Sequence, residues 1–215
     1  MTAGKNTGLN LAGRYGSWAL VTGAAVGLGA EFARQIAAQK INLVLVDIDK
    51  DNLENTASQI RTGLQVEVIA LALDLARDDL LEELDSQLAG REIALLVNNA
   101  GIPRLGEFEL QSPAFLLQQM KVNMQAVMLL THYFGTRMLA RGKGGIIILS
   151  SMAAMNGGAL NAHYSATKAY DLVLAESLWA EWKNKGVDVL GFMPWKTATP
   201  GYYKEATNSK EKDVL

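Results

Sequence analysis

Short apolar runs alternate with longer helical patterns along almost the whole chain, and this alternation limits the possible folds more than any other feature. Several of the short runs are apolar throughout, as in parallel strands that are buried on both faces. The pattern predicts a doubly wound parallel α/β sheet of about six strands in a single domain, with helices on both faces. Strands are expected at 18–21, 41–46, 66–73, 93–97, 145–149 and 187–192, and helices at 27–39, 50–61, 77–88, 112–140 and 162–184.

Length and composition argue against a disordered chain, a collagen-like chain and a disulfide-stabilised scaffold. The chain has 215 residues, of which 49% are hydrophobic, and this is ample for a sizeable core. A net charge of −2 gives no attraction to nucleic acid, so no nucleic-acid partner is expected. With no cysteine and two distant histidines, His132 and His163, we expect no disulfide and no metal site. We divide the chain into an N-terminal arm (1–17), a dinucleotide-binding catalytic domain (18–199) and a polar tail or truncated lid segment (200–215).

No targeting signal or membrane span is predicted. Residues 1–17 lack the apolar stretch of a secretory signal, and the longest apolar candidate, Ile146–Leu149, has the length of a strand. These features favour a cytoplasmic location.

Ligands of doubly wound sheets bind beyond the carboxyl ends of the strands, so the residues that follow each strand are the candidates for a site. The first strand is followed by Thr22-Gly23-Ala24-Ala25-Val26-Gly27-Leu28-Gly29. Glycines allow a tight turn and close approach of a ligand, and the helix that follows directs its free N–H groups at an anion. This segment predicts a pyrophosphate site, although its GxxxGxG spacing differs from the common GxGxxG fingerprint, and an ordinary glycine-rich turn is the alternative.

Acidic residues follow the second and third strands. Asp47 lies 18 residues beyond Gly29, near the offset of an acid that binds the adenosine ribose, with Ile48 beside it. Its carboxylate would repel a 2′-phosphate, so NAD is expected rather than NADP; a solvated turn residue is the alternative, and nearby Asp49 complicates the assignment. Asp74, next to Leu75, could accept from the adenine amino group or cap the following helix.

Polar residues also follow the fourth and fifth strands. Asn98-Asn99-Ala100-Gly101 leaves room for a flat ligand, and Ser150-Ser151 precedes Tyr164 and Lys168, which are one helical turn apart. A neighbouring ammonium favours the phenolate of a tyrosine, so such a residue can act as a general acid or base near neutral pH. The YxxxK spacing alone is a weak signal, because it is common on amphipathic helices. Together with the upstream serine and dinucleotide loop it strongly indicates a catalytic tyrosine and lysine.

Taken together, TGAAVGLG at 22–29, Asp47, Asp74, NNAG at 98–101, Asn123, Ser151 and YSATK at 164–168 resemble the short-chain dehydrogenase/reductase family, in its single-domain branch. The resemblance covers residues 18–199. It implies that Tyr164 exchanges a proton with the substrate oxygen and that Ser151 positions that oxygen. It also implies that Lys168 binds the nicotinamide ribose and lowers the tyrosine pKa, and that Asn123 kinks its helix and holds a water.

The resemblance further implies a homodimer or homotetramer through the two long helices, and cofactor contacts from Pro194, Thr197 and Thr199. The family pattern has glycine after this proline, where the chain carries Trp195, a bulky residue beside the nicotinamide region. Only 15 polar residues follow Pro200, where family members continue into a substrate lid and a seventh strand.

Three functions therefore remain open. The first is an NAD-dependent oxidoreductase that acts on a secondary alcohol or ketone, and the second is a nucleotide-binding protein with little catalysis. The third is an isomerase or dehydratase that uses the same cofactor.

Overall fold

The structure, a computed structural model, describes residues 10–195 and 197. Six strands form one parallel sheet in the order β3-β2-β1-β4-β5-β6. The strands are β1 (Trp18–Thr22), β2 (Asn42–Asp47), β3 (Val68–Ala72), β4 (Leu95–Asn98), β5 (Gly144–Leu149) and β6 (Val187–Phe192). The predicted doubly wound parallel sheet is confirmed, and the strand order reverses between β1 and β4.

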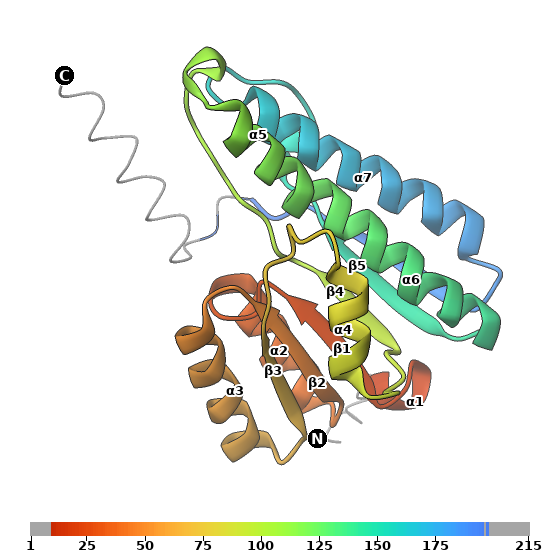
Figure 1. The fold of residues 1–215 in the computed structure, drawn as a ribbon. Coiled ribbons are helices and arrows are strands. Elements are labelled where there is room, and N and C mark those ends of the chain that lie inside the picture. The colour runs from red at the N-terminus through yellow and green to blue at the C-terminus, as the bar shows by residue number, and fades with distance from the viewer. Residues whose placement is uncertain (1–9, 196, 198–215) are drawn as a thin grey trace, which may run out of the picture.

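Helices cover both faces of this sheet (Figure 1). The helices α2 (Gly27–Ala38) and α3 (Lys50–Leu64) pack on one face, and α4 (Leu80–Leu88), α6 (Ala126–Arg141) and α7 (Ala162–Trp182) pack on the other. Each face has its own hydrophobic cluster, because side chains alternate across the strands: Leu20 joins one cluster and its neighbour Val21 the other.

The long helix predicted over 112–140 is interrupted. It divides into α5 (Pro113–Met120), a π-helical segment η2 (Lys121–Gln125) and α6. The π segment is centred on Asn123, in agreement with the kink that the family resemblance implies at this residue. π-helical turns inside α-helices occur often at functional sites, because they displace a side chain from the regular helical face.

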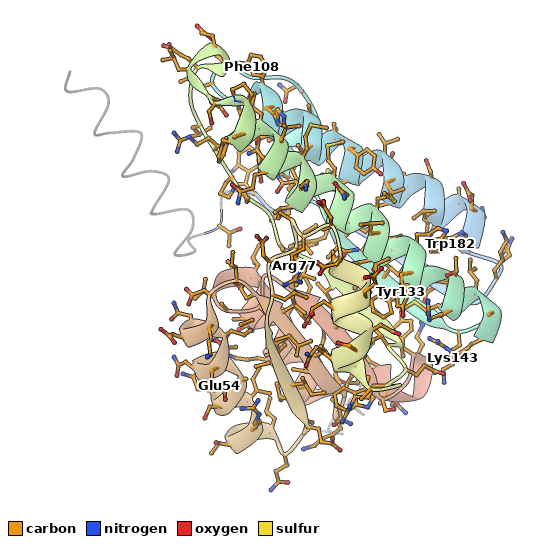
Figure 2. All side chains as sticks on the ribbon, viewed as in Figure 1. Glu54, Arg77, Phe108, Tyr133, Lys143 and Trp182 are labelled. Atoms are coloured by element: carbon orange, nitrogen blue, oxygen red, sulfur yellow. The ribbon has the colours of Figure 1, made fainter. Side chains whose placement is uncertain are left out.

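Trp182 at the end of α7 packs between the two long helices (Figure 2). Its indole leaves no room for a side chain on Gly135 of α6, since an added Cβ would lie 2.6 Å from its ring. Trp179, one turn earlier, is instead exposed and lies beneath the Lys183 ammonium. Of the two tryptophans, Trp182 therefore has the packing role.

Residues 10–17, the described part of the expected arm over 1–17, are ordered against the sheet. Asn10 caps a short helix, α1 (Leu11–Arg14), and Tyr15 follows it. The carboxylate of Asp188 on β6 accepts hydrogen bonds from the Tyr15 hydroxyl at 2.8 Å and from Arg14. These contacts hold residues 10–17 against the sheet. The expected tail, 200–215, lies outside the described residues.

Candidate active site

The loop between β1 and α2 has the backbone conformation that the glycine pattern predicts. Gly23 and Gly27 have φ values of 64° and 62°, which side chains rarely tolerate. At Gly29 an added Cβ would overlap the Gly23 carbonyl oxygen and lie 2.5 Å from Asn99 Nδ2. Val26, at the N-cap of α2, makes no side-chain capping hydrogen bond. The first N–H groups of α2 thus receive no hydrogen bond from the N-cap side chain. The loop beside them has no room for a side chain at Gly29.

Thr22 and Asn99 join the ends of β1 and β4, the two strands where the order reverses. The backbone N–H groups of Asn99 and Ala100 donate to Thr22 Oγ1 at 3.0 and 3.1 Å. The Asn99 side chain donates to the carbonyl oxygens of Thr22 and Gly23 at 2.9 and 3.0 Å. These bonds fix the floor of the crevice, so Asn99 has a structural role beside the cofactor role predicted for it.

Asp47 and Asp49 have different hydrogen-bond partners in the structure. Asp49 caps α3 by accepting from Asn52 N, and the bonds from Asn52 lower its pKa. Asp47 accepts one hydrogen bond on each carboxylate oxygen, from Ala25 N at 2.9 Å and Asp49 N at 3.0 Å. A carboxylate offers about four acceptor positions, so Asp47 retains capacity for a hydroxyl ligand. Ile48 next to it is 68% exposed.

Asp74 does not cap the next helix, one of the two roles that the sequence left open. The helix α4 begins at Leu80 and its N-cap is Asp79, so Asp74 lies in the preceding loop. Its Oδ1 accepts from Ala76 N at 2.9 Å, while Leu75 is buried in the core. The structure therefore leaves Asp74 at the end of β3, where the adenine contact was expected.

Asn123 is fully buried and connects three segments. Its Oδ1 accepts from Ile102 N at 2.8 Å, and its Nδ2 donates to Thr167 Oγ1 on α7 at 3.1 Å. Because Ile102 follows directly on Gly101, the π segment is tied to the loop after β4 and to α7. A Cβ added to Gly101 would lie 3.6 Å from Asn123 Oδ1 and 3.5 Å from Lys168 Nζ. The structure thus brings Gly101, Asn123 and Lys168 together.

Ser151 and Tyr164 lie at the same edge of the sheet. Ser151 lies two residues after the end of β5, and its Oγ accepts from Ala153 N in the short 3₁₀ helix η3 (Met152–Ala154), which packs against α7. Tyr164 lies in the first turn of α7, one turn before Lys168, and both hydroxyl residues are partly exposed. This edge therefore carries two hydroxyl residues, and Lys168 follows Tyr164 by one helical turn.

Lys168 is 4% exposed and is held by two acceptors. Its Nζ donates to Leu149 O at the end of β5 at 2.8 Å and to Asp171 Oδ2 at 2.9 Å. The sequence patterns did not single out Asp171; the available signal was an acidic residue three positions after Lys168 on an otherwise buried helix face.

The segment after β6 is described only in part. Pro194 O accepts from Met152 N at 3.4 Å, which joins this segment to η3. Trp195 is 70% exposed, and Thr197 donates to Trp195 O. Thr199 lies outside the described residues.

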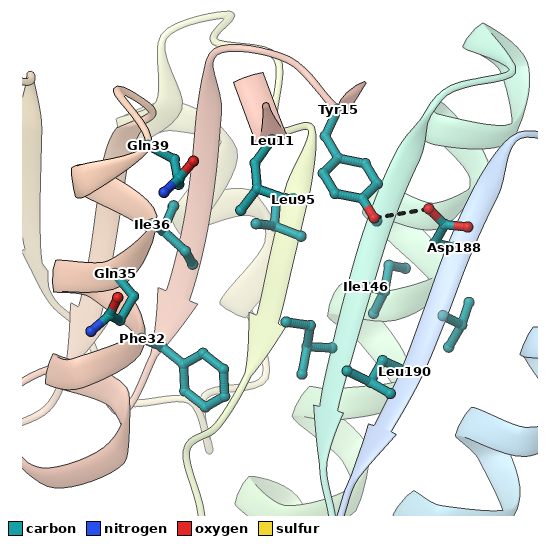
Figure 3. A pocket seen from close by; sticks show the side chains of 13 residues that line it. Leu11, Tyr15, Phe32, Gln35, Ile36, Gln39, Leu95, Ile146, Asp188 and Leu190 are labelled. Carbon is teal, nitrogen blue, oxygen red and sulfur yellow. Dashed lines mark hydrogen bonds between the residues drawn. The ribbon is translucent and has the colours of Figure 1, made fainter. Parts of the chain in front are cut away.

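A cavity of about 390 Å³ lies away from these motifs and is lined by residues of α1, α2, β4, β5 and β6 (Figure 3). Its lining includes Phe32, Ile147 and Leu190, together with the Tyr15–Asp188 hydrogen bond. None of the motif residues named above lines it, so it is separate from the candidate active site.

The described part of the chain shows neither a metal-binding cluster nor a membrane-spanning helix. No group of three or more His, Cys, Asp or Glu residues there is arranged to hold a metal ion. No helix in residues 10–195 is both long and apolar enough to cross a membrane.

Comparisons with known proteins agree with this geometry. The chain is 33% identical over 188 residues to the very-long-chain 3-oxoacyl-CoA reductase of Homo sapiens, a match that covers 86% of this chain and 60% of the relative. The corresponding reductase-A of Danio rerio is also 33% identical, and again 60% of its length is covered. The chain therefore spans about three fifths of these curated relatives.

Solved structures give the same result. A short-chain dehydrogenase from Sphingobium yanoikuyae, in complex with NADPH, is 30% identical with a TM-score of 0.83, covering 88% of this chain and 75% of that one. A bulky-bulky ketone specific alcohol dehydrogenase from Comamonas testosteroni is 31% identical with a TM-score of 0.81, covering 85% and 74%. The family model for the short chain dehydrogenase matches residues 17–210. This chain belongs to the short-chain dehydrogenase/reductase family.

Proposed function

We propose that this chain is an NAD(H)-dependent oxidoreductase that interconverts a secondary alcohol and a ketone. One observation carries the proposal: the glycine-rich loop of residues 22–29 (the glycine cradle), two hydroxyl residues and a buried lysine all lie at the carboxyl edge of one sheet. This edge is the usual ligand position of the fold. The activities named for its relatives, 3-oxoacyl-CoA and bulky ketone conversion, belong to the same class of reaction.

The residues at this edge fit a dinucleotide. The uncapped start of α2, with Gly23, Gly27 and Gly29, suits a pyrophosphate, because N–H groups and the helix dipole attract anions. Exposed Ile48 suits the flat face of an adenine, and Asp47 suits the hydroxyls of its ribose. When bound, the nicotinamide would give or accept the hydride.

Preference for NAD over NADP is part of the proposal. It rests on Asp47, whose carboxylate at the end of β2 would repel a 2′-phosphate. The short-chain dehydrogenase from Sphingobium yanoikuyae was solved with NADPH, so the proposed preference for NAD is based on Asp47 of this chain and not on the family. Tighter binding of NADPH than of NADH would contradict this assignment of Asp47.

In the direction of ketone reduction, Tyr164 would donate its hydroxyl proton to the carbonyl oxygen while hydride adds to the carbonyl carbon. Ser151 Oγ would donate a hydrogen bond to the same oxygen, which gains negative charge as the reaction proceeds. Lys168 would hold the ribose hydroxyls, and Asn123 would maintain the π-helical turn that brings Gly101 near Lys168. In alcohol oxidation Tyr164 would accept the proton.

A homodimer or homotetramer through the long helices is also proposed. Large apolar side chains are exposed on α5, α6 and α7, among them Leu117 (61%), Val173 (60%) and Trp179 (54%). Such surfaces are commonly covered by a partner. The predicted cytoplasmic location stays a prediction.

The test uses the purified chain with NADH or NADPH and a panel of ketones that includes bulky ketones and 3-oxoacyl thioesters. Removing the proton donor by Tyr164→Phe should lower kcat by about 10²–10⁴-fold, with binding of NADH unchanged. Tyr170→Phe is the matched control, since it makes the same change two positions beyond Lys168 on α7.

Other outcomes separate the alternatives. Binding of NADH without turnover of any substrate would favour the nucleotide-binding protein without catalysis. Product formation without net consumption of NADH would favour the isomerase or dehydratase. Turnover that survives Tyr164→Phe undiminished would contradict the proposed role of the tyrosine.

A further inference from the structure

A buried carboxylate with no part in the reaction above is paired with the lysine of the candidate active site. Asp171 lies on the inner face of α7, three residues after Lys168, and is fully buried. Its Oδ2 accepts from Lys168 Nζ at 2.9 Å, in an ion pair whose two side chains are 5% and 0% exposed. Its Oδ1 is buried without a hydrogen-bond partner among the described residues.

This ion pair uses a donor of Lys168 that a ligand would need. An ammonium has three N–H groups, and two are directed at Leu149 O and Asp171 Oδ2. One donor is left for the side of the site where Gly101 approaches Nζ. The two neighbouring hydroxyls of a ribose would take two donors, so full engagement of a ribose competes with one of the existing bonds.

Lys168 is the only charged side chain that bonds Asp171 among the described residues. The elements packed against α7 offer no second partner, because β5, η3 and α5 carry no charged residues. The charged side chains on η2, β6 and α6 have other partners: Lys121 pairs with Asp78, Asp188 with Arg14, Arg141 with Glu92, and Arg137 lies over Tyr133, while His132 is exposed. On α7 itself, the other titratable residues outside the site are His163 and Tyr170, which are partly exposed, and Glu176 and Glu181, which are exposed.

We propose that Asp171 competes with the nicotinamide ribose for Lys168 and thereby weakens dinucleotide binding. The inference rests on the dinucleotide site proposed above. In this arrangement Asp171 is a positioning residue: it holds the Lys168 ammonium toward α7 and offsets its positive charge. A dinucleotide, itself an anion, then meets a nearly neutral pair in place of a bare ammonium.

Protonation of Asp171 offers a way to observe this competition. Burial raises the pKa of Asp171 to about 6, and the charge and hydrogen bond of Lys168 act in the opposite direction. Below that pH the carboxyl is neutral and its hold on Lys168 is weaker. Dinucleotide affinity should therefore increase as the pH falls from 7.5 to 5.5.

The experiment measures the Kd for NAD⁺ by titration calorimetry. At pH 7.5, Asp171→Asn should bind NAD⁺ at least about tenfold more tightly than the wild type, the equivalent of one hydrogen bond to a charged group. Glu176→Gln makes the same charge change at an exposed position of α7 and should leave the Kd unchanged. In the Lys168→Met background the Asp171→Asn gain should fall below about twofold, because the competing donor is gone.

The wild type tests the proposal even where Asp171→Asn fails to fold. Its affinity for NAD⁺ should increase between pH 7.5 and 5.5, and that of Lys168→Met should stay constant, with His163 common to both. Binding of NAD⁺ by Asp171→Asn that is equal to or weaker than that of the wild type would overturn the proposed competition, and so would a pH dependence that persists in Lys168→Met. Either result would leave the proposed function intact. Absence of any binding of NAD⁺ and NADP⁺ by the wild type would overturn the proposed function and this inference together.

Discussion

Replacing Gly29 with alanine tests the glycine cradle. We expect this change to lower the free energy of unfolding, whereas the same change at an open helical position should raise it. Inside a helix, alanine is favoured over glycine by about 1 kcal/mol. At Gly29, however, the new Cβ would lie 2.7 Å from the carbonyl carbon and overlap the carbonyl oxygen of Gly23, and it would lie 2.5 Å from Asn99 Nδ2. Backbone atoms cannot rotate away as a flexible side chain can, so the loop itself must shift.

The expected magnitude follows from these opposing effects. Overpacking typically costs about 1–3 kcal/mol, and an overlap with backbone belongs at the upper end of that range. After the helix gain of about 1 kcal/mol is subtracted, Gly29→Ala should destabilise the protein by about 2 kcal/mol. For a domain of this size the Tm should fall by about 4–8 °C. The loop shift should also weaken binding of NAD⁺ by more than about tenfold, because the N–H groups move.

Gly63→Ala is the matched control. Gly63 is an exposed glycine in α3, and an added Cβ would meet no atom within 4 Å. This variant should be more stable than the wild type by up to about 1 kcal/mol and should bind NAD⁺ normally. Urea unfolding monitored by circular dichroism gives both free energies of unfolding. A Gly29→Ala variant that is as stable as Gly63→Ala, or that binds NAD⁺ like the wild type, would contradict a loop with no room for a Cβ at this position.

Three further predictions follow from other parts of the structure. Asp47→Ser should lower the NADH to NADPH affinity ratio by about tenfold or more, because the carboxylate that repels a 2′-phosphate is lost; fluorescence titration with both cofactors checks this, and an unchanged ratio would contradict it. Asp188→Ala should cost about 1 kcal/mol in urea unfolding through the lost Tyr15 bond. Burial, and after it the hydrogen bond to Asp188, raise the pKa of Tyr15 to about 12. In Asp188→Ala this pKa, measured from the absorbance change on tyrosine ionisation, should therefore be lower. An unchanged pKa would argue against the Tyr15–Asp188 bond. Burial raises the pKa of Asp171 in the folded protein from 3.8 to about 6. Between these pH values the folded protein keeps the Asp171 carboxyl protonated while the unfolded chain loses that proton, so the folded state loses stability as the pH rises through this range. The free energy of unfolding should therefore decrease from pH 4 to pH 6 in the wild type more than in Asp171→Asn, and parallel curves would contradict the burial of this group.

Much of the site could be predicted from the sequence because its parts are local. The positive φ values of Gly23 and Gly27 follow from a glycine-rich turn between a strand and a helix, and the neighbouring positions of Tyr164 and Lys168 follow from helical periodicity. Asp47 could be located because it ends an apolar strand. These signals depend only on short stretches of chain and on the rule that ligands bind at strand ends.

Other features could not be predicted, because they depend on contacts between distant segments. The family resemblance implies a kink at Asn123, but the form of that kink, a π-helical turn, is associated with side-chain bonds to Ile102 and Thr167 that local sequence patterns do not reveal. The role of Asp74 could not be decided either, because α4 begins at Leu80 with Asp79 as its N-cap, beyond the expected helix start. Residues 10–17 were expected to be loose, and Tyr15 and Arg14 instead bond Asp188, more than 170 residues away.

The fold class, the strand positions and the family could be predicted from the sequence alone, because hydrophobic periodicity and short motifs depend on local stretches of chain. The hydrogen-bond partners of Lys168, by contrast, depend on tertiary packing. Burial at the junction of β5 and α7 directs its ammonium at Leu149 and Asp171, since a buried charge must find partners within reach. That choice of partners depends on how two elements pack, and it bears directly on how the candidate site would bind a dinucleotide.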